Sequence, residues 1–215
     1  MFGKWFGNKA APERQIQRPQ ELQVGDMIQL TDSFALPGEL RGKMLQVTEV
    51  NTQEFEREHG PEFILKGDQP GLLYLTLDQD DETWLCFSKR ISREQVDALF
   101  GLEAFGALFE EPGEAQLEAR ALPALDGWHG DHYVQDAFAQ MGYFHRQDYR
   151  GGQPPAHEGR DAGEPFEYYG LGSADERYRV EVEVYEDGET DVSLTLVRPL
   201  SDIRGYFPGQ HGQPS

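Results

Sequence analysis

The feature that most constrains this fold is an alternation of apolar and polar residues near the C-terminus. Valines alternate with charged residues over 178–184, and the alternation returns over 191–196 after the turn-forming pair Asp187-Gly188. Successive side chains of a strand point to opposite faces of a sheet, so this spacing predicts a β-hairpin. One face of the hairpin is expected to be packed and the other solvated, as is common in antiparallel sheets.

Shorter apolar segments earlier in the chain indicate further strands. They cover residues 22–30, 44–50, 63–65, 72–77 and 83–87. Several short strands separated by turns are typical of a small antiparallel sheet or barrel.

The periodicity changes to that of a helix after the fifth of these strands. Ser92 is followed three residues later by Gln95, which is the pattern of a capping box, and apolar residues at helical spacing follow. Gly101 is expected to kink or split this helix. Further along the chain we expect a short helix over 133–141 and a strand over 143–149.

These elements predict an α+β fold that is mostly antiparallel β, with two sheet-forming halves joined by a helical segment. The order of strands, then helix, then strands again is the basis for this division. The expected parts are a flexible basic and aromatic tether (1–20), an N-terminal β-rich half (21–91), a helical connector (92–130), a C-terminal α+β half with a terminal hairpin (131–207) and a disordered tail (208–215).

The charge of the chain is strongly negative and unevenly spread. The formal net charge is −20, whereas residues 1–20 carry four basic residues against one acidic residue. An acidic body repels phosphate, which argues against nucleic-acid binding. The acidity either attracts a protein partner with a basic surface or keeps the protein soluble, and the sequence leaves both explanations open.

Several features indicate a cytoplasmic protein. The sequence has one cysteine and lacks an apolar run of the length that spans a membrane. The first residues do not resemble a signal peptide. Phe2, Lys4, Trp5 and Phe6 nevertheless combine aromatic and basic side chains, which predicts contact with a partner or weak peripheral contact with the inner membrane. The alternative is that they dock onto the body of the protein itself.

The segment around residue 130 contains candidate metal ligands. His129, Asp131 and His132 are the residue types that bind zinc or another transition metal. A complete site needs further ligands, and Asp126, Asp136 or His145 could supply them. The alternative is a polar loop beside a packed tryptophan.

Other segments approach known motifs without meeting them. Residues 78–82 begin like a calcium loop but have Thr83 where the loop needs glycine, so we expect a solvated hairpin turn. Residues 170–175 have the first two glycines of a dinucleotide fingerprint but Asp175 in place of the third, so we expect a turn. Cys86 has apolar neighbours, which predicts a buried and unreactive thiol.

Glu181 and Glu183 lie on the polar face of the predicted terminal hairpin. Their separation of about 7 Å along a strand would suit acid–base chemistry. Solvation beside Arg179 explains them more simply, so we interpret them as part of a solvated face.

The chain resembles the YjfK-like family of bacterial proteins of unknown function. The resemblance covers most of the chain and is carried by residues 2–7, 22–26, 74–91, 167–170 and 198–203. It implies a genomic context beside membrane-remodelling proteins similar to phage-shock protein A. It implies no catalytic residues.

The sequence therefore predicts a non-enzymatic acidic binding or adaptor protein. The family resemblance adds a role accessory to a phage-shock-type membrane-stress system, with a phage-shock-protein-A-like protein as the partner. No motif indicates a cofactor. The alternatives are a metal-dependent enzyme that uses His129, Asp131 and His132, and a small-molecule-binding module with a cleft between the two halves.

Overall fold

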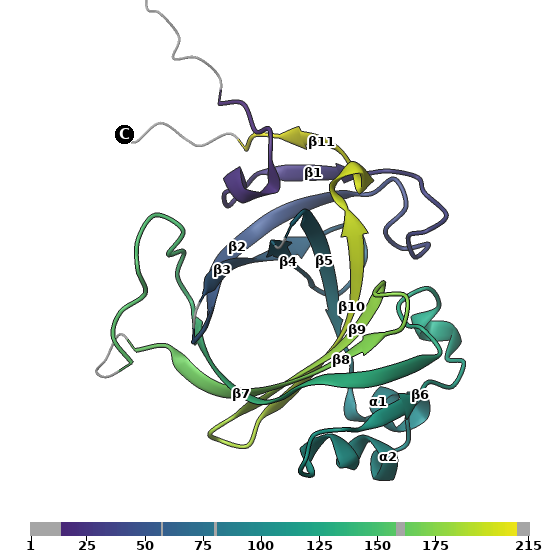
Figure 1. The fold of residues 1–215 in the computed structure, drawn as a ribbon. Helices are drawn as coiled ribbons and strands as arrows, with labels where there is room; N and C mark the ends of the chain where they lie inside the picture. The colour runs from purple at the N-terminus through teal and green to yellow at the C-terminus, as the bar shows by residue number, and fades with distance from the viewer. Residues whose placement is uncertain (1–13, 57, 80, 158–161, 210–215) are drawn as a thin grey trace, which may run out of the picture.

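The structure is a computed structural model that describes residues 14–56, 58–79, 81–157 and 162–209. Strands dominate it (Figure 1). None of the helices in this part of the chain is long and apolar enough to cross a membrane. The strands are β1 (Met27–Leu30), β2 (Met44–Phe55), β3 (His59–Lys66), β4 (Leu73–Gln79), β5 (Thr83–Arg90), β6 (Gln116–Glu118), β7 (His132–His145), β8 (Glu164–Ser173), β9 (Tyr178–Tyr185), β10 (Thr190–Pro199) and β11 (Ile203–Phe207), and the helices are α1 (Arg93–Leu99) and α2 (Leu102–Gly106), with 3-10 turns at Pro19–Glu21, Ala107–Phe109, Pro123–Leu125 and Leu200–Asp202.

The described strands form one antiparallel sheet that closes on itself. Its order is β11-β1-β2-β3-β4-β5-β10-β9-β8-β7-β6, and β2 also pairs with β7. The strands from β2 round to β7 therefore form a barrel, and Figure 1 looks down its interior. The strands β1 and β11 continue from β2 outside the barrel, and β6 continues from β7.

The length of β2 and β7 explains how the barrel closes. The first part of β2 pairs with β1, whereas its last part, from Thr52 to Phe55, pairs with β7 from His145 to Gly142. Both strands carry register shifts, and β7 includes Ala139 at a φ of 47°. Such irregularities bend a strand and increase its twist. Each strand can therefore leave one neighbour and turn onto the next.

The apolar face of the barrel points outward. Leu75, Phe87 and Val182 are fully buried, and they belong to one core with residues of segments outside the barrel, such as Leu40 and Leu99. Because side chains alternate along a strand, the residues between these apolar ones point inward. The polar face of the sheet therefore lines the interior of the barrel.

The helical segment begins as the sequence predicts. Ser92 Oγ accepts a hydrogen bond from the Gln95 amide, and the Gln95 side chain accepts one from the Ser92 amide, which confirms the capping box. Gly101, with a φ of 82°, separates α1 from α2, so the predicted helix is split there. In Figure 1 these helices lie against the outside of the barrel.

The structure does not confirm two sheet-forming halves joined by a helical connector. The N-terminal strands continue directly into the C-terminal ones, because β5 pairs with β10 along seven positions from Ser193 to Pro199. The pairing of β2 with β7 joins the same two parts of the chain at a second seam. Residues 92–130 therefore cover the barrel and do not separate two sheets.

The predicted helix over 133–141 is wrong, because these residues belong to β7. The start of β7 alternates between exposed and buried residues, as Tyr133, Val134 and Gln135 show. The register shifts near Ala137 then interrupt the alternation. Their effect is to hide the period of two that identifies a strand in a sequence.

The described part of the predicted tether is packed onto the body. The Arg14 guanidinium pairs with the fully buried carboxylate of Asp26 at 2.8 Å, and Pro19 is buried. Gly209, in the predicted tail, donates its amide to the same carboxylate. Phe2, Lys4, Trp5 and Phe6 lie outside the described residues.

Candidate functional site

The polar interior of the barrel contains three adjoining spaces. A wide chamber of about 600 Å³ opens at one end, a narrow waist of about 40 Å³ follows, and a vestibule of about 260 Å³ lies beyond. Residues shared between neighbouring spaces show that they adjoin. The chamber and the waist share Gln53, Thr76, Tyr168 and Glu181, and the waist and the vestibule share Glu62, Tyr74, Arg90 and Asp191.

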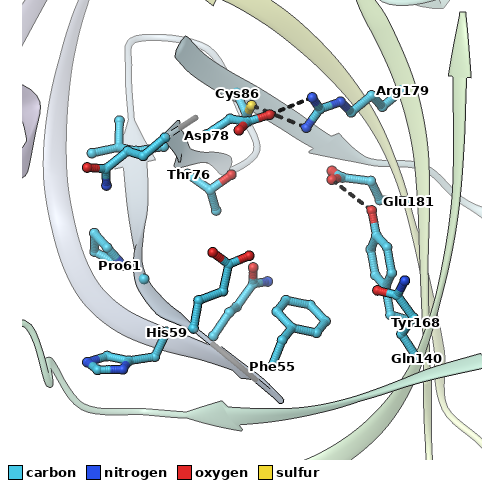
Figure 2. A pocket seen from close by; sticks show the side chains of 15 residues that line it. Phe55, His59, Pro61, Thr76, Asp78, Cys86, Gln140, Tyr168, Arg179 and Glu181 are labelled. Carbon is cyan, nitrogen blue, oxygen red and sulfur yellow. Dashed lines mark hydrogen bonds and ion pairs between the residues drawn. The ribbon is translucent and has the colours of Figure 1, made fainter. Parts of the chain in front are cut away.

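The chamber has a charged wall and an aromatic wall (Figure 2). Arg179 of β9 donates to Asp78 of β4 at 2.6 Å, and its other terminal nitrogen lies 3.9 Å from the Cys86 sulfur. Away from this group, Phe55 and Tyr168 meet edge to face with 5.6 Å between ring centroids. The chamber can therefore contact both a polar group and an apolar body.

Cys86 is buried, as the sequence predicts, although it lines the chamber and does not face the apolar core. Burial raises the pKa of its thiol to about 12. A thiol with so high a pKa holds its proton at neutral pH and is a poor nucleophile.

The waist brings together carboxylates from opposite sides of the barrel. Gln53 of β2 donates its side-chain amide to Glu183 of β9 at 2.9 Å and to Glu62 of β3 at 3.3 Å. Tyr185 donates its hydroxyl to the second oxygen of Glu183 at 2.7 Å. These bonds hold two carboxyl groups from strands that are distant in the sheet beside one amide.

A third carboxylate, that of Glu181, lies between the chamber and the waist. It accepts hydrogen bonds from the hydroxyls of Tyr168 and Thr195, and Thr195 is itself bonded to Ser88 at 2.8 Å. The side chains that fix Glu181 come from three strands, β8 and β10 on either side of β9 and β5 next to β10, so the sheet itself sets its position.

Burial perturbs the titration of this cluster. Glu62 is 5% exposed, and burial, reinforced by the charge of Glu183, raises its pKa to about 8. Burial likewise raises the pKa of Glu183 to about 7, even though the Tyr185 hydroxyl and Arg90 favour its charged form. A cation on the vestibule side, Arg90, is bonded to Asp191 at 2.7 Å and lies over the ring of Tyr74.

Comparisons of the chain with protein-family models, with curated proteins and with solved structures found no match. The geometry of the barrel interior is therefore the basis on which a function can be inferred.

The solvated face predicted for Glu181 and Glu183 requires correction. Both residues do lie on the polar face of the β9–β10 hairpin, and the pairing of these strands confirms the hairpin. This face lines the closed interior and carries hydrogen-bonded groups. The reason is the pairing of β2 with β7, which folds the polar face inward.

The sequence reasoning missed Glu62 and Gln53. Glu62 directly precedes the three apolar residues 63–65. A charged residue beside an apolar strand was the signal that could have identified it as a candidate site residue. Gln53 lies beyond the predicted end of its strand, because β2 continues to Phe55. Neither residue could be paired with Glu183 before the order of the strands was known.

The predicted metal ligands do not meet in the barrel. The Nδ1 atom of His129 bonds to the neighbouring Gly130 carbonyl at 2.9 Å, and His132 is exposed at the start of β7. None of His129, Asp131 and His132 lines the chamber, the waist or the vestibule. Among residues 14–56, 58–79, 81–157 and 162–209, no group of three or more His, Cys, Asp or Glu side chains could hold a metal ion.

Two of the residues suggested as further ligands, His145 and Asp136, have other surroundings. His145 bonds to Glu54 at 2.8 Å. Asp136 faces two glycines of β8, where a Cβ atom at Gly170 would come within 2.9 Å of its carboxylate. Gly170 therefore lies in β8 and leaves room for the Asp136 side chain. The turn that was predicted over 170–175 begins only after Ser173, where β8 ends.

Proposed function

We propose that this protein is a non-catalytic binding protein that holds a small polar ligand inside its barrel. The observation that carries the proposal is the inward-facing polar surface around a chamber of about 600 Å³. A barrel of about eight strands has an interior that is either filled by side chains or able to hold one small ligand. Ligand sites in proteins commonly measure about 300–1,000 Å³.

The bonding of the chamber walls favours binding over catalysis. Arg179 is held by Asp78, and Glu181 is held by Tyr168 and Thr195. Side chains fixed in this way form a preorganised surface, which lowers the entropic cost of binding. The thiol of Cys86, whose pKa burial raises to about 12, is protonated at neutral pH.

Calorimetry with a panel of small cationic, neutral and anionic polar molecules tests this proposal. We expect at least one class to bind the intact protein. Thr76→Trp places an indole between the chamber and the waist and should abolish that binding. Val134→Trp is the matched control, because Val134 is 47% exposed on β7 and lines none of the three spaces. The proposal is wrong if no class binds, or if both variants bind as the intact protein does.

A second candidate is the adaptor function predicted from the sequence. The net charge of −20 favours a protein partner with a basic surface, and the YjfK-like resemblance proposes a phage-shock-protein-A-like protein. Peripheral membrane contact through Phe2, Lys4, Trp5 and Phe6 belongs to the same proposal. We expect such a partner to co-purify at low salt and to dissociate at about 0.5 M salt, where the Debye length is only a few ångströms. Retention of the partner at high salt would contradict an electrostatic adaptor.

A further inference from the structure

We infer that the ligand of the barrel is a small organic amine whose ammonium group lies in the waist beside Glu62 and Glu183. This inference rests on the proposed binding function and specifies the chemical class of its ligand.

The first support is a buried oxygen that lacks a partner. Glu62 is 5% exposed, and its Oε1 atom accepts no hydrogen bond from the described residues. Its other oxygen accepts a long bond of 3.3 Å from Gln53. Buried polar atoms are nearly always bonded in folded proteins. The waist and the vestibule both border Glu62, so a donor in either space lies beside the residue that carries this oxygen.

The second support is the balance of charge around the waist. Its acidic groups come from three strands, and its cation, Arg90, is already engaged by Asp191 and by the face of Tyr74. An anionic ligand would therefore lie beside carboxylates. Among the described residues that line the waist, the cation that could pair with it is already engaged. The titratable groups that line the waist are Glu62 of β3, Tyr74 of β4, Arg90 of β5, Tyr168 of β8, Glu181 and Glu183 of β9, and Asp191 of β10.

The third support is the shape of the space. The waist, at about 40 Å³, admits a group about the size of a water molecule or an ammonium ion. The adjoining chamber is wide enough for the rest of the molecule and offers the rings of Phe55 and Tyr168 as an apolar wall (Figure 2). An amine with an apolar or aromatic body matches both parts. A bare metal ion does not, since no suitable ligand group exists among the described residues.

Binding of an ammonium group would release a proton. Burial raises the pKa of Glu62 to about 8 and that of Glu183 to about 7, so the empty site holds a proton near neutral pH. As the ammonium arrives, the Glu62 carboxyl group gives its proton to the solvent, and the carboxylate that forms pairs with the ammonium group. Affinity should therefore rise with pH by up to about tenfold per pH unit below about pH 8.

Calorimetry with 2-phenylethylamine, 2-phenylethanol and phenylacetate tests the class, because the three probes share one body and differ in charge. We expect the amine to bind at least tenfold more tightly than the alcohol or the acid. Titrations in buffers of different ionisation enthalpy should show release of about one proton per amine near pH 7. Glu62→Gln should weaken amine binding at least tenfold and reduce the proton release. Glu118→Gln, on the exposed face of β6, should leave both unchanged.

The outcomes separate this inference from the proposed function. Equal binding of the alcohol or the acid, lost in Thr76→Trp, would overturn the amine and leave the binding function standing. The amine is likewise overturned, and the binding function stands, if 2-phenylethylamine does not bind while another molecule of the cationic, neutral and anionic panel does. Binding by no member of the panel would overturn both. Amine binding that is unchanged in Glu62→Gln would place the ligand elsewhere and overturn the inference.

Discussion

Replacing Glu62 by glutamine should make the protein more stable, and the gain should grow with pH. Glu62 is 5% exposed, and burial, with the charge of Glu183 as the next cause, raises its pKa from an ordinary value of 4.5 to about 8. Between these two values the folded protein holds a proton that the unfolded chain has lost. Raising the pH through this window therefore favours unfolding. Glutamine has nearly the shape of the protonated carboxyl group and does not titrate.

The size of the effect follows from linkage. A tenfold change in an equilibrium corresponds to about 1.4 kcal/mol, so the gap between 4.5 and about 8 corresponds to a full penalty of about 5 kcal/mol above pH 8. At about pH 5.5 only about 1–2 kcal/mol of this penalty is expressed, and at about pH 8.5 nearly all of it is. The advantage of Glu62→Gln over the native protein should therefore increase by about 3 kcal/mol between these two pH values.

Urea unfolding of both proteins at the two pH values measures this difference directly. Glu118→Gln is the control, because Glu118 is exposed on β6, and its unfolding free energy should follow that of the native protein at both pH values. An advantage of Glu62→Gln that is constant with pH, or that shrinks as the pH rises, would refute the reasoning. Either result would mean that the Glu62 carboxyl group is ionised in the folded protein at neutral pH.

Three further predictions concern the frame around the site. Asp26→Ala removes a fully buried carboxylate that accepts hydrogen bonds from an arginine and from two backbone amides. Urea unfolding should therefore show a free energy of unfolding lower by about 3–5 kcal/mol. Asp68→Ala, the control, removes an exposed ion pair and should change the free energy of unfolding little. Gly142→Ala places a Cβ atom 2.5 Å from a buried phenylalanine of β8 and should lower the unfolding free energy by about 1–3 kcal/mol, whereas Gly60→Ala meets nothing within 4 Å. The native thiol of Cys86, with its pKa raised by burial to about 12, should not react with iodoacetamide at about pH 8 until urea unfolds the protein. Equal stability in each matched pair, or rapid native alkylation, would contradict the corresponding prediction.

Part of the candidate site could be predicted from the sequence. The alternation around Glu181 and Glu183 placed both carboxylates on one polar face, and the structure agrees. The direction in which that face points could not be predicted, since an alternating pattern is the same whether the polar side faces solvent or a closed interior. The charge of Glu62 beside an apolar strand was a weak local signal, and Gln53 gave none. The role of both residues depends on Glu183 of β9, which lies 121 and 130 positions away in the sequence.

The sequence by itself determined the local elements. A period of two specified the β9–β10 hairpin, and the side chains of Ser92 and Gln95 specified the start of α1, because these features depend on residues that are close in the chain. Only the tertiary structure decided that β2 turns from β1 onto β7 and closes the barrel. That pairing joins residues about ninety positions apart, and its consequence is a polar face turned inward around buried carboxylates. Strand order and closure depend on contacts between distant segments, which no short window of sequence contains.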